Sequence, residues 1–398
     1  MQNKNYSPAL LPTLLALLLA GCASVAPVSP LPTPPVACAC PPGEVIAEPL
    51  KPAEKPLQAA DWSQLPGWGD DIAPTFDAFV NSCKVIERQS LWSEVCASAR
   101  NADRNDLRGW FEAQLQPWQL VNPDGNREGL VTGYYEPLIR ASRKPDKTYR
   151  YPVFGVPDDM ITVDLSEVYP ELKSMRLRGR LVGKKLLPYY SRADWSEQET
   201  KRANNAMLWT DDAIDLFFLQ IQGSGQVDLA DGQRIRIGYA DQNGHPYRSI
   251  GRWLADQGEM NIDQTSMQGI KAWAAENPKR LQELLNTNPS MVFFRELKVE
   301  GSGPPGALAV PLTPERSIAV DPRITPLGSP VWLATTRPNS DEPLQRLMLA
   351  QDTGGAIRGP VRADFYWGSG AEAGALAGRM KQKGQMWVLL PKGHAPKQ

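Results

Sequence analysis

The spacing of apolar residues along this 398-residue chain changes several times. Between residues 73 and 116 apolar residues recur every three or four positions, which predicts helices. Runs of apolar and β-branched residues predict strands at 129–135, 151–156, 180–187, 213–221 and 233–239. Helices are expected again at 249–255, 264–275 and 279–285. Strands then follow to the C-terminal end, except for one helix at about 372–383 that Gly384 ends.

Many short strands separated by Gly and Pro favour a mainly β fold with barrel-like architecture and helices added at its edges. No internal repeat is visible in the sequence. The globular part, about 340 residues, is long enough for two domains.

The N-terminus predicts export. Lys4 precedes an apolar run at residues 10–20, which is too short for a permanent bilayer span and typical of a signal peptide. Residues 19–22, Leu-Ala-Gly-Cys, resemble a bacterial lipobox, which implies cleavage before Cys22 and its acylation. Because Ala23 rather than Asp follows, the resemblance implies an outer-membrane lipoprotein that faces the periplasm of a Gram-negative bacterium. The alternative is a plain secretory signal with an incidental cysteine.

Residues 23–57 are rich in proline, which predicts an extended spacer without a core. The net charge is −1 and no basic stripe is present, so a nucleic-acid partner is not expected. The chain has two histidines, His245 and His394, too few for a His-rich metal site. Neither a Gly-x-Ser-x-Gly turn nor a phosphate-binding glycine loop is present, and no cofactor or metal is expected.

Two cysteines of the globular part, Cys83 and Cys96, lie thirteen residues apart in a helical stretch. In an oxidising periplasm this pair predicts a disulfide, and the alternative is two buried free thiols.

Two acids near the C-terminus are the first candidates for chemistry. Asp352 and Asp364 lie on two apolar runs joined by a glycine-rich turn, which predicts a hairpin-like pair of strands with one acid on each arm. Apolar and aromatic neighbours such as Val361 and Phe365 should desolvate Asp364 and raise its pKa. A carboxylic acid that stays protonated near neutral pH suits the cleavage of a glycosidic bond.

Three further segments carry polar groups that packing does not require. In Thr132-Gly133-Tyr134-Tyr135, consecutive strand residues face opposite sides, so at least one tyrosine ring is expected in a groove. Gln220 and Gln222 are expected on one face of a strand, where two amides suit an amino sugar or simply face solvent. Asp321 precedes Pro322, a pattern typical of a turn.

Together these segments resemble the lytic murein transglycosylase A family. The resemblance covers residues 75–392. It rests on GYYEP at 133–137, QIQGSG at 220–225, GHPYRS at 244–249, AVDPRITPLGSPVW at 319–332 and QDTGGAIRGPVRADFYWG at 351–368. The C-terminal part resembles the three-aspartate module, with Asp321, Asp352 and Asp364 as the three acids.

The resemblance implies a double-psi β-barrel domain with a second β-barrel domain inserted in it and a groove between the two. On that basis residues 1–21 are the signal peptide and 22–57 the lipid-anchored spacer. Residues 58–135 and 298–398 form the catalytic barrel, and residues 136–297 form the insert.

The resemblance also implies a lyase-type peptidoglycan exotransglycosylase. Such an enzyme cuts the β-1,4 bond between N-acetylmuramic acid and N-acetylglucosamine without water and leaves a 1,6-anhydromuramoyl end. Asp364 maps onto the single catalytic acid. The expected substrate contacts come from Asp352, Asp321, Thr132, Tyr134, Tyr135 and Gln222. The partners implied are a peptidoglycan glycan strand, the membrane through the lipid anchor, and wall-synthesis enzymes as candidates.

Some relatives have His-Phe-Asp where this chain has Arg362-Ala363-Asp364, and this chain has one more residue between its two acids. Two other functions fit the same segments. One is a hydrolytic muramidase that uses Asp352 and Asp364 as a pair. The other is a non-catalytic wall-binding protein on an expansin-like barrel.

Overall fold

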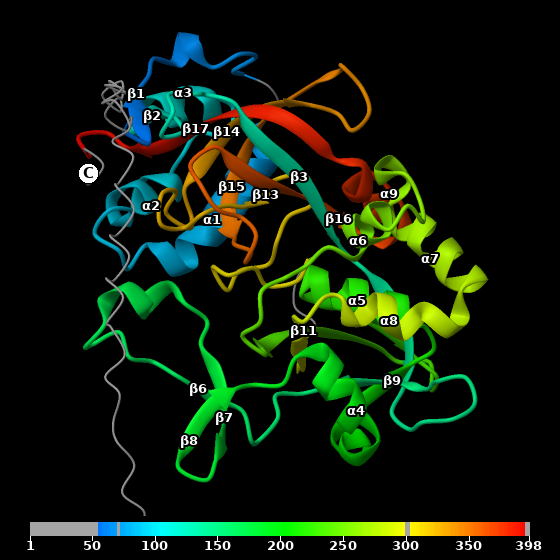
Figure 1. The fold of residues 1–398 in the computed structure, drawn as a ribbon. Coiled ribbons are helices and arrows are strands. Elements are labelled where there is room, and N and C mark those ends of the chain that lie inside the picture. Colours follow the sequence, from blue (N-terminus) through cyan, green and yellow to red (C-terminus); the bar gives the residue numbers. More distant parts are fainter. Residues whose placement is uncertain (1–54, 70–71, 299–302, 395–398) are drawn as a thin grey trace, which may run out of the picture. The chain divides into compact units, whose positions relative to one another are not determined.

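The computed structural model describes residues 55–69, 72–298 and 303–394, which belong to one compact unit, Pro52–Gln398. Cys22, the predicted signal peptide and nearly all of the predicted spacer lie outside the described residues. None of the helices in the described part is long and apolar enough to cross a membrane. Figure 1 shows two bodies of secondary structure within this unit, connected by the long strand β3 (Gly129–Glu136).

Eight strands form the first body, in the order β1-β2-β17-β14-β15-β13-β16-β3. β17 also pairs with β3, so the six strands from β17 round to β3 close into a barrel. Its interior is filled by side chains such as Trp332, Leu349 and Phe365, none of which is exposed. The other strands of this body are β1 (Leu57–Ala59), β2 (Leu115–Leu120), β13 (Ser317–Ala319), β14 (Pro330–Thr336), β15 (Pro343–Asp352), β16 (Arg362–Ser369) and β17 (Lys381–Pro391).

Four helices pack on this barrel: α1 (Ala73–Ile86), α2 (Ser93–Ala99), α3 (Leu107–Gln114) and α9 (Gly370–Arg379). α1 buries Phe76 and Phe79 in the barrel core, and the hydroxyl of Thr75 donates to the backbone oxygen of Leu347 in β15 at 2.7 Å. α9 packs against β3 and β16. The barrel strands that contain Asp352 and Asp364 therefore contact helices from both ends of the described chain, α1 and α9.

The second body is a six-stranded sheet in the order β12-β11-β10-β4-β9-β5, in which the end strands β12 and β5 also contact each other. Its strands are β4 (Leu138–Ser142), β5 (Tyr151–Phe154), β9 (Ala206–Thr210), β10 (Ser224–Leu229), β11 (Arg234–Gln242) and β12 (Val292–Leu297). The helices of this body are α4 (Arg192–Arg202), α5 (Ala213–Gln222), α6 (Ile250–Asp256), α7 (Met267–Glu276) and α8 (Leu281–Asn286). Short 3-10 turns occupy Trp62–Gln64, Pro170–Ser174, Ala203–Asn205, Ile262–Gln264 and Pro278–Arg280.

The two bodies are joined around a buried ion pair. Glu136 ends β3, and its carboxylate accepts from the guanidinium of Arg236 in β11 at 2.6 Å; neither side chain is more than 5% exposed. Nη1 of Arg236 also donates to the backbone oxygen of Gly303, in the segment that returns to the barrel. One arginine therefore holds both passages of the chain between the two bodies.

Residues 213–221 form helix α5 and not the predicted strand. The carboxylate of Asp212 caps the helix by accepting from the backbone N–H of Ile214 and Asp215, and Gly223 ends it with φ +80°. An unbroken apolar run does not distinguish a buried helix from a buried strand, and here the capping residues decide.

Two further predictions were wrong in detail. β15 and β16 do not form a hairpin, because β13 lies between them and pairs with both. The last predicted helix ends at Arg379 and not at residue 383, because residues from Lys381 onward pair with β3 as part of β17. In both cases a distant strand competes for the backbone, and local sequence does not report such partners.

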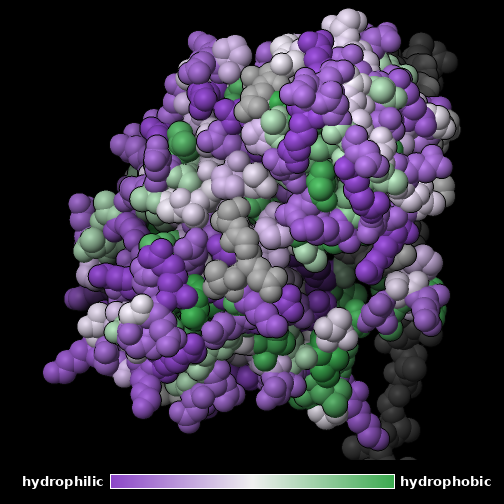
Figure 2. All heavy atoms as spheres, turned by 180° about the vertical axis from the view of Figure 1, so that it is seen from behind, coloured by the Kyte–Doolittle hydropathy of each residue, from purple (hydrophilic) through white to green (hydrophobic). Residues whose placement is uncertain are grey.

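A third sheet projects from the second body. β6 (Ile161–Thr162), β7 (Arg178–Val182) and β8 (Lys185–Pro188) form it in that order. The predicted strand at 180–187 is thus the end of a hairpin. Polar residues cover much of the face seen in Figure 2, and an apolar projection stands out at the lower right, where β7 and β8 lie when Figure 1 is viewed from behind.

Candidate active site

The two C-terminal acids are brought together by the short central strand β13. Ala319 pairs with Asp352 of β15 on one side and with Asp364 of β16 on the other. Directly opposed residues point to the same face of a sheet, so both carboxylates emerge on the face that Ala319 occupies. With β13 between them, their Cα atoms are separated by two strand spacings, about 10 Å.

Asp364 is partly buried and has one protein partner for its carboxylate. The hydroxyl of Thr132, which pairs with Asp364 across β3 and β16, donates to Oδ1 at 2.6 Å. Oδ2 accepts no hydrogen bond from the described residues. Burial raises the pKa of Asp364 to about 6, and the nearby charge of Asp352 adds to this, whereas the Thr132 hydroxyl and the Arg362 guanidinium oppose it. About a tenth of this carboxyl is therefore protonated at pH 7, far more than for an ordinary aspartate.

Arg362 fixes the direction of the Thr132 hydroxyl. Its Nη2 donates to Oγ1 of Thr132 at 2.9 Å, and its Nη1 donates to the backbone oxygens of Leu130 and Ala363. Because the guanidinium carries only donors, Thr132 accepts from Arg362 and its own proton points at Asp364. The three side chains thus form a directed chain of hydrogen bonds.

Asp352 is held much more tightly than Asp364. Its Oδ1 accepts from the backbone N–H of Thr353 at 2.9 Å and of Ala307 at 3.0 Å, and its Oδ2 accepts from the hydroxyl of Tyr134 at 3.0 Å. Burial raises the pKa of Asp352, and these three donors oppose that rise. Burial and the neighbouring acids raise the pKa of Tyr134 well above its ordinary value, so Tyr134 keeps the proton that it donates.

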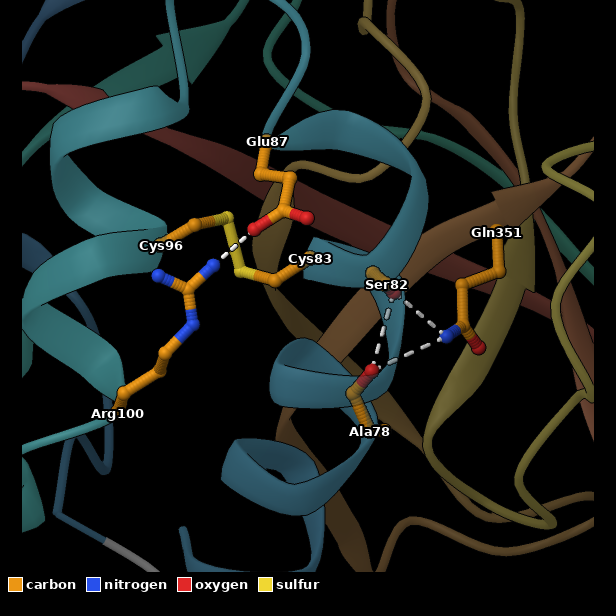
Figure 3. Close-up of a disulfide and its surroundings, with 7 residues drawn as sticks. All are labelled: Ala78, Ser82, Cys83, Glu87, Cys96, Arg100 and Gln351. Carbon is orange, nitrogen blue, oxygen red and sulfur yellow. Dashed lines mark hydrogen bonds and ion pairs between the residues drawn. A yellow bond between two sulfur atoms is a disulfide. The ribbon is translucent and has the colours of Figure 1, made fainter.

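A buried amide behind Asp352 ties the site to helix α1. Gln351 accepts from the hydroxyl of Ser317 at 2.5 Å, and it donates to the hydroxyl of Ser82 at 2.8 Å and to the backbone oxygen of Ala78 at 3.4 Å. Figure 3 shows this contact beside the disulfide between Cys83 and Cys96, whose Cα atoms are 5.5 Å apart. The disulfide joins α1 to α2, and an ion pair between Glu87 and Arg100 lies next to it. The support of Asp352 therefore reaches back to the N-terminal helices.

The carboxylate of Asp321, the third aspartate, is occupied by hydrogen bonds and an ion pair within the protein. Its carboxylate pairs with the guanidinium of Arg323 at 2.5 and 2.8 Å and accepts from the backbone N–H groups of Arg323 and Gly359. The hydrogen bonds from Arg323 lower the pKa of Asp321 to about 2, and its side chain is only 1% exposed. Asp321 thus connects the end of β13 to the glycine-rich loop between the two catalytic candidates, and its side chain is buried against these partners.

Two of the predicted substrate contacts lie in supporting positions. Tyr135 is buried, its hydroxyl lies 3.4 Å from the sulfur of Met267, and its ring packs against Gly374 of α9. Gln222, at the end of α5, accepts from the backbone N–H of Tyr135 at 3.1 Å. Of the two tyrosines, Tyr134 is the one that is partly exposed, as was expected for at least one of them. The centres of the Tyr134 and Tyr366 rings are 5.2 Å apart.

Three supporting groups were not identified from the sequence: the guanidinium of Arg362, the amide of Gln351 and the backbone N–H of Ala307. Of these, only Gln351 could have been found from the sequence, because a polar residue inside an apolar strand requires buried hydrogen-bond partners.

Among the described residues, no group of three or more His, Cys, Asp or Glu side chains could hold a metal ion. A pocket of about 210 Å³ lined by Phe154, Trp195 and Arg202 contains none of the predicted site residues.

Comparison with known proteins identifies the family. Residues 130–295 match the MltA specific insert domain and residues 316–390 match the 3D domain. The membrane-bound lytic murein transglycosylase A of Escherichia coli K12 is 34% identical over 294 residues, 71% of this chain and 72% of that protein. The protein of that name from Vibrio cholerae is 32% identical over 350 residues, 79% of this chain and 86% of the relative. This chain belongs to the lytic murein transglycosylase A family.

Solved structures of MltA proteins and of one further lytic transglycosylase resemble this fold. MltA from Neisseria gonorrhoeae matches with a TM-score of 0.75 and 39% identity over 86% of this chain and 94% of that one. E. coli MltA with bound chitohexaose matches with a TM-score of 0.66 and 28% identity over 87% and 96%. The lytic transglycosylase LtgG of Burkholderia pseudomallei is 45% identical over 86% and 97%, with a TM-score of 0.58. The predicted family and the mainly β fold with added helices are confirmed.

Proposed function

We propose that this protein is a lytic transglycosylase that cleaves the β-1,4 bond between N-acetylmuramic acid and N-acetylglucosamine in peptidoglycan. The product is a 1,6-anhydromuramoyl end. The names of the relatives support the reaction class, and the glycan bound to E. coli MltA supports a glycan strand as the ligand. The observation that carries the assignment of the acid is the environment of Asp364. It is a carboxyl with a pKa of about 6 that keeps one oxygen without a protein partner among the described residues.

In the proposed mechanism, protonated Asp364 donates its proton to O4 of the leaving N-acetylglucosamine. Positive charge develops on the muramic acid ring, and the nearby carboxylates stabilise it. The Asp364 carboxylate then accepts the proton of the C6 hydroxyl while O6 attacks C1 of the same sugar. This intramolecular attack replaces water and gains from high effective molarity.

The setting of Asp352 favours this route over hydrolysis. A hydrolase needs a second carboxylate that activates water or attacks the sugar itself. Both oxygens of Asp352 already accept hydrogen bonds, from two backbone N–H groups and from Tyr134. We assign Asp352 to the electrostatics and orientation of the site and Asp364 to proton transfer.

We place the glycan strand in a groove between the barrel (residues 58–135 and 298–398) and the insert (residues 136–297), with Tyr134 in its wall. We place Cys22 as the acylated anchor of an outer-membrane lipoprotein that faces the periplasm. The words "membrane-bound" in the names of two relatives support attachment to a membrane.

The test is digestion of purified sacculi, followed by mass analysis of the released fragments. Anhydromuramoyl products, lighter by one water than those of a hydrolase, are expected. Asp364→Asn should abolish release while glycan binding persists, and the exposed Asp341→Asn should behave like the parent. Hydrated products would establish a muramidase. Binding without release by the parent would favour the expansin-like alternative, and substantial release by Asp364→Asn would refute the assignment of the acid.

A further inference from the structure

Among the described residues, the exposed apolar side chains are concentrated in one short segment. More than half of the large apolar residues that are exposed in this part of the chain lie between residues 156 and 187, among them Val168 at 72% and Leu181 at 63%. The full set in this segment is Val156, Ile161, Leu165, Val168, Tyr169, Met175, Leu181, Val182, Leu186 and Leu187. A concentration of exposed apolar side chains of this kind indicates an interaction surface in a folded protein.

The hairpin of β7 and β8 forms the end of this segment. Every residue from 181 to 188 is exposed, and the turn is made by Gly183, with φ +59°, and Lys184. The strand register places Leu181 opposite Leu186 on one face. Val182 and Leu187 belong to the other face by alternation. Both faces of the hairpin end are therefore apolar, and neither is covered by the described residues.

The base of the hairpin is fixed, in contrast to its end. Nη2 of Arg178 pairs with the carboxylate of Asp241 in β11 at 2.9 Å, and both side chains are about 15% exposed. The guanidinium of Arg180 lies 4.3 Å from the ring centre of Tyr190, and Tyr189, directly after β8, is buried. A Cβ atom added at Gly183 would meet nothing within 4 Å. The hairpin is thus held at its base by contacts with the insert, whereas its end, residues 181–188, is exposed.

The charge of the hairpin is one-sided. Residues 176–188 contain five basic residues and no acid. Two of the basic residues, Arg178 and Arg180, make contacts at the foot of the hairpin, with Asp241 and Tyr190. Lys184 and Lys185 are exposed at its end. The acids of the segment 156–187 all precede the hairpin; they are Asp158, Asp159, Asp164, Glu167 and Glu171. The end itself therefore combines exposed apolar side chains with exposed positive charge.

We propose that the end of this hairpin, residues 181–188, binds an anionic phospholipid surface. A protein or a glycan docked on a flat strand face covers one side, whereas a lipid interface surrounds the hairpin and covers both. The two lysines suit anionic headgroups, and their long side chains can extend to that level while the leucines enter the acyl boundary. β8 is an edge strand, and its unpaired backbone groups would restrict it to the interfacial depth.

This surface would hold the insert against the membrane by a contact that is separate from the lipid anchor. The inference rests on the proposed location in the cell envelope and not on the proposed chemistry of Asp364. None of the residues in the hairpin end belongs to the candidate active site. Loss of the membrane contact and loss of cleavage can therefore be measured independently.

The test uses residues 23–398, which lack the signal peptide and Cys22 but keep the whole compact unit from Pro52. Flotation with vesicles of phosphatidylethanolamine and phosphatidylglycerol is compared with flotation with phosphatidylcholine vesicles. Binding to the anionic vesicles only is expected, and it should weaken with added salt. The pairs Leu181→Ser/Leu186→Ser and Lys184→Gln/Lys185→Gln should each reduce binding at least tenfold.

Matched controls change the same residue types elsewhere on the insert. Ile262→Ser removes a side chain that is 51% exposed, and Lys144→Gln/Lys147→Gln removes two exposed charges. Both controls should bind like the parent, and all variants should release fragments from sacculi at the parental rate. Failure of the parent to bind anionic vesicles, or equal binding by the hairpin variants, would overturn the proposal. So would hairpin-dependent self-association or hairpin-dependent binding to sacculi in the absence of lipid.

Discussion

Thr132 and Asp364 face each other across β3 and β16, and the hydroxyl of Thr132 donates to the Asp364 carboxylate at 2.6 Å. This hydrogen bond stabilises the charged carboxylate, whereas burial stabilises the neutral acid. The two opposing effects leave the pKa of Asp364 at about 6. A proton donor with that pKa is partly protonated in a neutral periplasm and can also act as a base in the second half of the reaction.

Replacement of Thr132 by valine should move the pH profile of cleavage upward. Valine keeps the shape but removes the donor to the carboxylate, so the pKa of Asp364 rises. The alkaline limb of the rate, which depends on protonated Asp364, should shift by about one pH unit from its midpoint near 6. Initial rates of fragment release between pH 5 and 9 would measure the shift. Thr132→Ser, which keeps the hydroxyl, should restore the parental midpoint, and a valine profile with an unchanged midpoint would contradict the role given to Thr132.

Arg362→Gln should shift the same limb in the same direction. The guanidinium lowers the pKa of Asp364 by its charge and also orients the Thr132 hydroxyl. Glutamine removes the charge but retains an amide donor. The upward shift should therefore come from the lost charge, with a smaller fall in the maximal rate than Thr132→Val produces. Titration of activity at two salt concentrations would test this, since only a charge effect weakens with salt. A downward shift would contradict the assignment.

The sequence predicted the elements of this fold better than their partners. Strand 129–135 and the helices from residue 73 onward carry clear local patterns, and the structure contains them as β3 and α1 to α3. The hairpin predicted for Asp352 and Asp364 failed because β13, more than thirty residues earlier in the sequence, inserts between their strands. The pairing of Ala319 with both acids depends on this long-range insertion, and local spacing carries no information about it.

In the candidate active site too, local sequence predicted some features, while others depend on distant parts of the chain. The apolar neighbours of Asp364 predicted a raised pKa, and burial raises it. Tyr135 and Gln222 were expected to contact substrate on the basis of their side chains and of the resemblance, and in the structure both make contacts within the protein. Tyr135 faces α9 and Gln222 holds the backbone of β3. Which of two adjacent strand residues faces the core depends on the layer that covers each face of the sheet, and that layer here is a helix from the other end of the chain.

Asp364→Asn should make the protein more stable at pH 7.5 while it abolishes cleavage. The folded state holds the Asp364 proton up to a pKa of about 6, whereas the unfolded chain releases it near 3.8. The carboxyl therefore supports folding at low pH, and this support is lost as the pH rises through 6. Removal of the ionisable group should increase the free energy of unfolding by about 1–3 kcal/mol at pH 7.5. Urea unfolding at pH 7.5 and at pH 4 would test this, and the gain should vanish at the lower pH.

Asp321→Asn is the matched substitution with the opposite sign. Its pKa is lowered to about 2 in the folded protein, so the charged form contributes stability above 3.8 that is lost as the pH falls through 2. Since Arg323 is more than half exposed, solvent screening reduces the effect, and a loss of about 1–2 kcal/mol is expected at neutral pH. Destabilisation by both variants at pH 7.5 would show that the carboxyls act only through packing.

The disulfide between Cys83 and Cys96 should stabilise the fold without taking part in catalysis. It closes a loop of thirteen residues between α1 and α2, and its loss in Cys83→Ser/Cys96→Ser should lower the free energy of unfolding by about 3 kcal/mol. α1 should nevertheless remain docked, because Phe76 and Phe79 are buried in the core and Ser82 still donates to Ala78 and accepts from Gln351. Cleavage at 25 °C should therefore continue, while the temperature of half-inactivation falls.

Treatment of the parent with dithiothreitol should reproduce this lower temperature of half-inactivation and leave that of the double variant unchanged. A parent that keeps its half-inactivation temperature after complete reduction would show that the disulfide adds nothing to stability.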